Sequence, residues 1–167
     1  MGRLLPMPDV EVDNETTYPV RDEAAAEIVR RVLAAEGADA AIAVAFLDEP
    51  AVAELNGRYR GYAESTDVLS FPAAGGEDVD WPELEEAEDE FLGDVVICPA
   101  VAERNALEDE ISLGEEICRL LVHGALHLLG YDHEADEGEM RAREVVLLGQ
   151  MGEPEGGLLG LEGKAGD

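Results

Sequence analysis

The chain carries His123-Gly-Ala-Leu-His127-Leu-Leu-Gly130-Tyr-Asp-His133, a stretch that holds all three of its histidines. His123 and His127 are four positions apart, so on a helix their side chains share one face, with Cβ atoms about 5–6 Å apart. Gly130 follows where a glycine can turn the chain left-handed at little cost. His133 then lies on the returning chain and can complete the group. The spacing therefore predicts a helix that ends near Gly130 and carries a metal site.

The chemistry of this predicted site is that of a catalytic zinc ion. Three neutral imidazoles leave the fourth position of a tetrahedral Zn²⁺ to water, whereas structural zinc sites use all four. Water bound to such an ion has a pKa near ~7. We therefore expect one Zn²⁺ per chain, held by His123, His127 and His133. The alternative, three unconnected structural histidines, fits the regular spacing less well.

The same spacing, His-x-x-x-His-x-x-Gly-x-x-His, occurs in the metzincin proteases. Those enzymes have a glutamate directly after the first histidine, and it acts as the general base. Here that position is Gly124, which cannot accept a proton from water. A protease remains an alternative, weakened at the residue that would carry its chemistry.

The order of the predicted elements indicates an α+β fold: a small mixed β-sheet flanked by about five helices, with the metal site in a cleft. Strands are expected over residues 9–16, 40–47, 66–71 and 91–98, and helices over 22–36, from 48 onward, 100–108, 113–129 and 135–151. The first strand is predicted at a sheet edge, residues 40–47 are predicted to be buried on both faces, and Asp22 is predicted to cap its helix. Residues 1–151 are predicted to form one domain, residues 152–167 a disordered tail, and residues 73–90 an acidic surface insertion.

The composition is extremely acidic. The chain has 40 acidic against 11 basic residues and a formal net charge of -29. At about 1 M salt the Debye length falls to about 3 Å, so repulsion between surface carboxylates is screened. We interpret the charge as an adaptation to high intracellular salt, the alternative being an ordinary acidic protein. No apolar run is long enough to span a membrane, and two cysteines, Cys98 and Cys118, make no disulfide framework, so a cytoplasmic protein is expected.

Four separate blocks of the sequence resemble the YbeY family of bacterial ribosomal-RNA maturation factors, described as metal-dependent single-strand endoribonucleases. They are, in order, Leu55-Asn-Gly-Arg-Tyr-Arg60, Ser65-Thr-Asp-Val-Leu-Ser-Phe-Pro72, Leu92-Gly-Asp-Val-Val-Ile97 and the histidine stretch itself. The resemblance covers roughly residues 50–150. The chain departs from the family pattern in the longer acidic segment before Leu92 and in lacking the usual lysine after Arg60, which removes one phosphate contact.

The resemblance implies a zinc-dependent endoribonuclease that matures small-subunit ribosomal RNA, including its 3′ end, and serves ribosome quality control. It implies Arg60 and His123 as catalytic residues. An arginine suits phosphodiester chemistry because its guanidinium can hold two phosphate oxygens at once, although Arg60 can equally be a surface arginine paired with an acid. Asp94 and Asp132 are possible partners that orient the metal ligands, and the alternative for Asp94 is a turn carboxylate.

The expected partners are single-stranded RNA, the small ribosomal subunit and its assembly factors, with neither DNA nor a membrane. The net charge of -29 opposes RNA binding, so local positive charge from Arg58, Arg60 and the metal must outweigh the distant acids. A second function therefore stays open: a metal-stabilised ribosome-assembly factor that binds proteins and cleaves little RNA. The general base cannot be assigned from the sequence.

Overall fold

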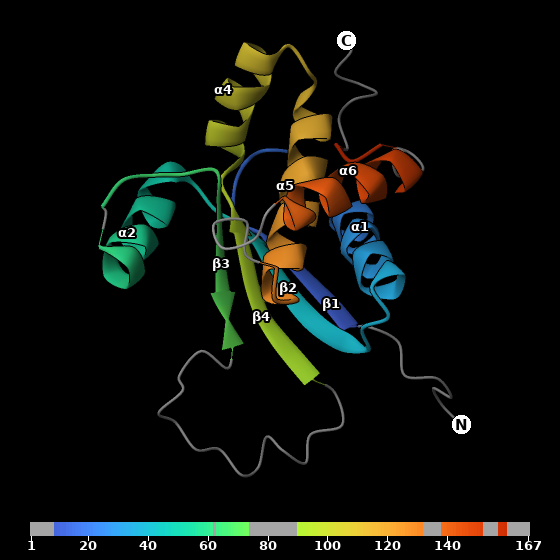
Figure 1. The fold of residues 1–167 in the computed structure, drawn as a ribbon. Coiled ribbons are helices and arrows are strands. Elements are labelled where there is room, and N and C mark those ends of the chain that lie inside the picture. Colours follow the sequence, from blue (N-terminus) through green and yellow to red (C-terminus); the bar gives the residue numbers. More distant parts are fainter. Residues whose placement is uncertain (1–8, 62, 74–89, 132–137, 152–156, 160–167) are drawn as a thin grey trace.

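The computed structural model of the chain describes residues 9–61, 63–73, 90–131, 138–151 and 157–159. The elements are β1 (Asp9–Asn14), α1 (Asp22–Ala35), β2 (Ala40–Phe46), α2 (Glu49–Arg60), β3 (Val68–Pro72), β4 (Glu90–Ile97), α4 (Pro99–Asp109), α5 (Leu113–Leu128) and α6 (Glu139–Met151). Four strands form one mixed sheet, and helices lie around it (Figure 1). The predicted α+β fold is confirmed.

The sheet has the strand order β1-β2-β4-β3. Strands β1, β2 and β4 are parallel, with Val12 opposite Val44 and Val44 opposite Val95, and β3 runs antiparallel to β4. The strand predicted over residues 9–16 is indeed an edge strand, and β3 forms the other edge. The β3 edge becomes important for the site, because α5 and α2 both lie near it.

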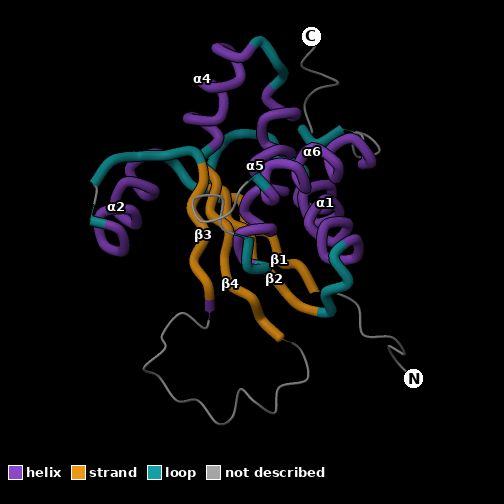
Figure 2. The backbone as a smooth tube through the Cα atoms, viewed as in Figure 1, coloured by secondary structure: helices purple, strands orange, loops and turns teal. Residues whose placement is uncertain are grey.

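Helices α1 and α5 cover one face of the sheet, and α6 packs against both of them. Figure 2 shows α2 apart from this group, beyond β3. There Val52 of α2 joins a small apolar cluster with Leu69 and Val96 on the second face. The main core lies between the first face and the α1–α5 layer, where Ile42 and Phe46 of β2 are almost completely buried.

Strand β2 differs from its prediction of burial on both faces. Its residues alternate between buried and half-buried from Ala40 to Phe46. The half-buried face carries Ala43 and Ala45, which line a shallow hollow. Apolar composition alone does not distinguish a strand covered on both faces from one whose second face carries only small alanine side chains.

Helix α1 begins at residue 22, as predicted, but its cap is a different residue. Its N-cap is Arg21, which makes no side-chain capping bond, and Asp22 is the first helical residue rather than the cap. A carboxylate in the first turn still interacts favourably with the helix dipole. The Arg21 backbone N–H donates to the Leu158 carbonyl at 2.8 Å.

The tail predicted to be disordered over residues 152–167 is ordered in its described part, residues 157–159. Leu158 is 3% exposed and belongs to the main core, and Leu159 forms an antiparallel bridge with Val20. The prediction of disorder rested on the many glycines of the tail and overlooked the two leucines that pack against the rest of the protein. The rest of the predicted tail and nearly all of the acidic insertion lie outside the described residues. No helix among the described segments is long and apolar enough to cross a membrane.

Candidate active site

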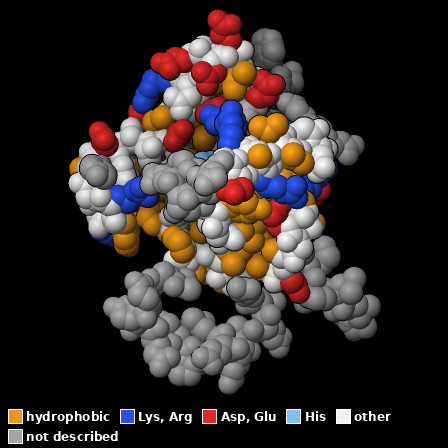
Figure 3. All heavy atoms as spheres, in the orientation of Figure 1, with side chains coloured by type: hydrophobic (Ala, Val, Ile, Leu, Met, Phe, Trp, Pro, Cys, Tyr) orange, Lys and Arg blue, Asp and Glu red, His pale blue; other side chains and the backbone are white. Residues whose placement is uncertain are grey.

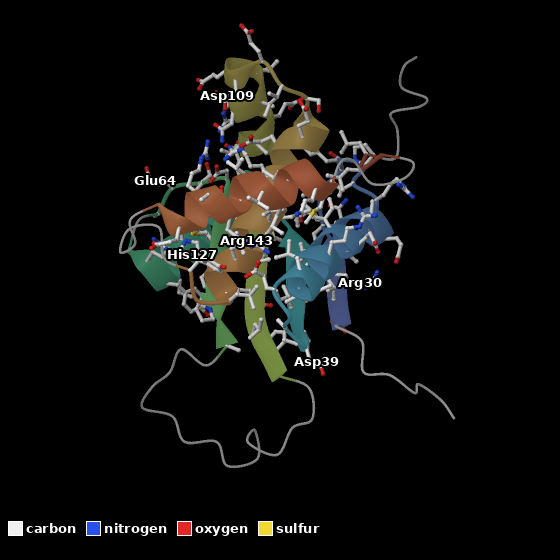
Figure 4. The ribbon with its side chains drawn as sticks, turned by 45° about the vertical axis from the view of Figure 1, so that its right-hand side comes forward. Arg30, Asp39, Glu64, Asp109, His127 and Arg143 are labelled. Carbon is white, nitrogen blue, oxygen red and sulfur yellow. The ribbon has the colours of Figure 1, made fainter. Side chains whose placement is uncertain are left out.

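An open pocket of about 430 Å³ lies between the end of α2, the segment that leads into β3, and the helix α5. Its lining includes Arg60, Thr66, Ser70, His123 and His127. Figure 4 labels His127 on α5 and Glu64 after α2, which both line this pocket. Three of the four blocks that carry the family resemblance therefore contribute to one surface.

Helix α5 carries the two histidines, and both of its ends are capped. At its start, the Ser112 hydroxyl accepts from the Glu115 backbone N–H while the Glu115 carboxylate accepts from that of Ser112, both at 3.0 Å. Such a capping box satisfies two backbone donors that the helix leaves unpaired. At its end, Gly130 has φ 107°, and the Tyr131 N–H donates to the Leu126 carbonyl. The predicted left-handed turn is therefore present.

His123 and His127 lie side by side in the pocket. Their ring centroids are 5.0 Å apart and their planes are inclined by 75°. The His123 side chain is 25% exposed, so the ring is partly enclosed but open to the pocket. Two imidazoles at this separation suit a shared metal ion, and their role as ligands stays a prediction.

Gly124 stands between the histidines because α5 lies very close to β4 there. A Cβ atom at this position would lie 2.7 Å from Cγ1 of Val95, which is completely buried. The Gly124 carbonyl also accepts a hydrogen bond of 3.4 Å from the Ser70 hydroxyl on β3. A glutamate therefore does not fit at the position where the metzincin proteases carry their base.

Arg60 reaches the same pocket from α2. It is exposed and occupies the last helical position before Gly61, whose φ of 86° ends the helix. One turn earlier, the buried Asn56 donates from its side-chain amide to the Glu64 carbonyl at 2.9 Å. This bond holds the segment after α2 against the helix, and the segment continues into Thr66 at the pocket wall. The structure thus brings Arg60 together with both described histidines.

Sequence reasoning missed a direct partner of His123. Oε2 of Glu144 on α6 lies 2.5 Å from His123 Nδ1, and Glu144 is only 4% exposed. Its other carboxylate oxygen lies 3.8 Å from the Arg141 guanidinium. The sequence contains one signal for this contact: Glu144 is an acidic residue at a core-facing position of its helix, between the buried Met140 and Leu147.

An ion pair between a buried glutamate and a half-buried arginine precedes His123 on α5. Glu116 is completely buried and accepts from the Arg119 guanidinium at 2.7 and 2.9 Å. Burial lowers the pKa of Arg119, but the hydrogen bonds to Glu116 and the charges of Glu116, Asp67 and Glu144 raise it overall. The charge of Arg119, four positions before His123 on the same helix, is therefore paired with that of Glu116.

The other predicted site residues are not placed in this pocket. Asp94 alternates with Val95 along β4 and lines the hollow on the opposite side with Glu11 and Asp13, where burial raises its pKa. It is a strand residue rather than a turn carboxylate, and it is not a partner of His123 or His127. Asp132 and His133 lie outside the described residues.

The described donor atoms fit part of a metal site. No group of three or more His, Cys, Asp or Glu side chains that could hold a metal occurs within the described residues. The described residues supply two imidazoles, and the third predicted ligand is His133. Of the two cysteines, Cys98 is buried and Cys118 is only half-buried.

Known proteins are similar in sequence to this chain over most of its length. The family model of Endoribonuclease YbeY matches residues 11–152. Endoribonuclease YbeY of Desulforamulus reducens is 44% identical over 129 residues, or 75% of this chain and 82% of that protein. The same enzyme of Mycolicibacterium smegmatis is 39% identical over 145 residues, or 83% of this chain and 80% of that protein.

A solved structure has a similar fold. The solution structure of TM1509 from Thermotoga maritima is similar with a TM-score of 0.58 and 28% identity, and the match covers 83% of this chain and 86% of that one. The predicted resemblance is therefore confirmed, and the chain belongs to the endoribonuclease YbeY family.

Proposed function

We propose that this chain is a zinc-dependent endoribonuclease that cleaves single-stranded RNA in the pocket between α2, β3 and α5. The observation that carries the proposal is the joint lining of that pocket by the Arg60 guanidinium and the imidazoles of His123 and His127. Membership of the endoribonuclease YbeY family supports RNA as the substrate class.

The residues of the pocket would have two roles: some would bind the RNA backbone and others would hold the metal. Arg60 can hold two phosphate oxygens and stabilise the charge that develops on phosphorus during cleavage. Thr66 and Ser70 present hydroxyl groups at the same wall, which can bond to phosphate or ribose oxygens. His123, His127 and the predicted ligand His133 would hold the metal, which supplies Lewis acidity when bound.

We further propose that the substrate is small-subunit ribosomal RNA, including its 3′ end, and that the protein acts in the cytoplasm with the small subunit and its assembly factors, in ribosome maturation and quality control. The family resemblance supports this context. The open pocket suits an unpaired strand, and a hydroxyl-lined wall offers partners for the ribose 2′-hydroxyl that distinguishes RNA from DNA.

A cleavage assay with zinc-loaded protein tests this proposal. We expect single-stranded RNA to be cut, single-stranded DNA of the same sequence to remain intact, and casein to remain intact. His127→Ala should hold well below one equivalent of Zn²⁺ and lose cleavage. Glu108→Gln, an exposed change on α4, is the control and should retain both.

Two other results would overturn the proposal in different ways. Cleavage of casein without cleavage of RNA would indicate a protease despite Gly124. Full zinc content without turnover of RNA, measured in molar KCl where repulsion is screened, would indicate the assembly factor that binds protein partners.

A further inference from the structure

We propose that Glu144 is a positioning residue, which holds His123 in the tautomer and orientation that present Nε2 to the metal. The proposal rests on the proposed metal site and goes beyond it, since it assigns a role to a residue of α6. Its basis is the distance of 2.5 Å between Glu144 Oε2 and His123 Nδ1.

The burial of Glu144 is the first argument. A carboxylate that is 4% exposed is costly to bury unless it is hydrogen-bonded and faces positive charge. Glu144 lies between Met140 and Leu147, both buried residues of the core-facing side of α6. An apolar residue would suit such a position for packing alone, so its contact with His123 accounts for the carboxylate.

The charges around Glu144 are the second argument. Arg141 lies 3.8 Å from Oε1, the oxygen that does not face His123. Arg119, on the same helix as His123, interacts with the charge of Glu144. Both arginines place positive charge near the carboxyl group whose oxygen faces Nδ1, an arrangement that suits a hydrogen bond donated by Nδ1–H.

The consequence for the imidazole follows from its two tautomers. A neutral ring has one N–H and one lone pair, and the hydrogen bond of one nitrogen decides which nitrogen can bind a metal. With Nδ1–H donating to Glu144, the lone pair stands on Nε2, at the other end of a ring that lines the pocket. Carboxylates behind metal-binding histidines also raise the basicity of the ligand, and their loss typically weakens metal binding about 10–100-fold.

Zinc titration against a competing chelator tests this role. Glu144→Leu should bind Zn²⁺ about 10–100-fold more weakly than the wild type. Glu144→Gln should lie between the two, because its amide oxygen still accepts from Nδ1–H but carries no charge. Leu147→Val, a neighbouring core change on the same helix, is the matched control and should lower stability without weakening zinc binding.

A spectroscopic measurement separates positioning from general damage to the fold. Long-range ¹H–¹⁵N spectra of the metal-free protein report the tautomer of each imidazole, and the chain has only three histidines to assign. We expect His123 to be protonated at Nδ1 in the wild type and in Leu147→Val, and to shift toward protonation at Nε2 in Glu144→Leu.

Two outcomes would overturn the proposal: a wild-type His123 with its proton on Nε2, or zinc binding in Glu144→Leu and Glu144→Gln that equals the wild type. If the wild-type protein bound no Zn²⁺ at all, the proposed metal site would fail instead. The tautomer spectra would then still decide whether Glu144 sets the state of His123.

Discussion

Gly124 shows how one residue connects the sequence pattern with the packing. The pattern predicts only that no general base stands after His123, whereas the structure gives the physical reason. Helix α5 lies so close to β4 that a Cβ atom would be 2.7 Å from Val95 Cγ1. Both branches of the stiff Val95 side chain are within 3.1 Å of that point, so the side chain cannot simply rotate away.

Gly124→Ala should therefore destabilise the protein, although alanine is the better helix former by about 1 kcal/mol. Overpacking a core typically costs about 1–3 kcal/mol, so we expect a net loss of about 1 kcal/mol. Urea unfolding measures this loss as a lower midpoint concentration with an unchanged m-value. Combining the change with Val95→Ala should cost less than the sum of the two single changes, because the smaller side chain makes room. A Gly124→Ala protein as stable as the wild type would contradict this account of the packing.

Arg60 is the residue on which RNA cleavage should depend most directly. We expect Arg60→Ala to keep its fold and its zinc but to lose cleavage by about 10²-fold or more, the usual effect of removing one transition-state donor. Arg60→Lys should restore little, since an ammonium group cannot hold two phosphate oxygens in the same plane.

The control for Arg60 is its neighbour on the same helix. Arg58→Ala removes the same charge two positions away, outside the pocket lining, where Arg58 pairs with Glu54. It should retain most of the activity. Equal losses in the two variants would show that Arg60 contributes only general charge, as a surface arginine would.

Residue spacing predicted the two described histidines but not their partner. His123 and His127 are close in sequence, so helix geometry alone brings them together. Glu144 meets His123 because α6 packs across α5, and no local sequence pattern encodes how two helices cross. Asp94 was misplaced for a related reason: neighbouring strand residues point to opposite faces, and the sequence did not show which face carried the histidines.

At the scale of elements, the sequence predicted the type of each described helix and strand. It did not determine the sheet order β1-β2-β4-β3. Strands β2 and β4 pair in parallel although α2 and β3 lie between them in the sequence, and no local pattern indicates that pairing. That pairing decides the site, since it leaves β3 at the edge, where α2 can bring Arg60 to the histidines of α5.

Glu36, at the end of α1, connects three elements near the site. Its carboxylate accepts from the Tyr131 hydroxyl at 2.8 Å and from Arg143 Nε of α6 at 2.5 Å. Tyr131 lies just after the turn that ends α5. This arrangement fixes α6, and with it Glu144, relative to α5.

Glu36→Ala should therefore lower the free energy of unfolding by about 1–3 kcal/mol, the usual cost of leaving hydrogen-bonded groups without a charged partner. It should also weaken zinc binding, since α6 loses an anchor. Glu27→Ala on the same helix is the control: Glu27 pairs with Arg30 and Arg31 on the surface, where such pairs contribute about 0–1 kcal/mol. If both variants behaved alike in denaturant and in zinc titration, the connection would have no special role.

At the scale of the whole molecule, the charge balance requires an explanation that neither the fold nor the pocket provides. With 40 acidic and 11 basic residues, most carboxylates cannot have a basic partner. Figure 3 shows acidic and basic side chains interspersed on one face of the molecule. Repulsion among the surplus carboxylates should destabilise the compact state at low salt.

Stability should therefore rise with salt, as the hypothesis of an adaptation to high salt predicts. We expect a higher melting temperature at about 2 M than at about 0.1 M KCl, because screening shortens the range of repulsion. The variant Glu108→Gln/Asp109→Asn removes two exposed acids at the C-terminal end of α4, where negative charge also opposes the helix dipole. It should gain stability mainly at low salt. An equal or lower melting temperature of the wild type in high salt would contradict the proposed adaptation.

RNA cleavage should follow the same trend, for a reason that concerns the whole surface. Proteins that bind nucleic acid through many basic residues lose affinity steeply as salt rises, because binding releases counterions. Here the acids dominate at long range and Arg60 acts at short range, so screening should remove more repulsion than attraction. We therefore expect kcat/KM for a single-stranded RNA to hold or rise from about 0.1 M to about 0.5 M KCl, with circular dichroism confirming the fold at each point. A steep fall over that range in a folded protein would show instead that counterion release at the arginines governs binding, and that the acidic surface lies too far from the RNA to oppose it.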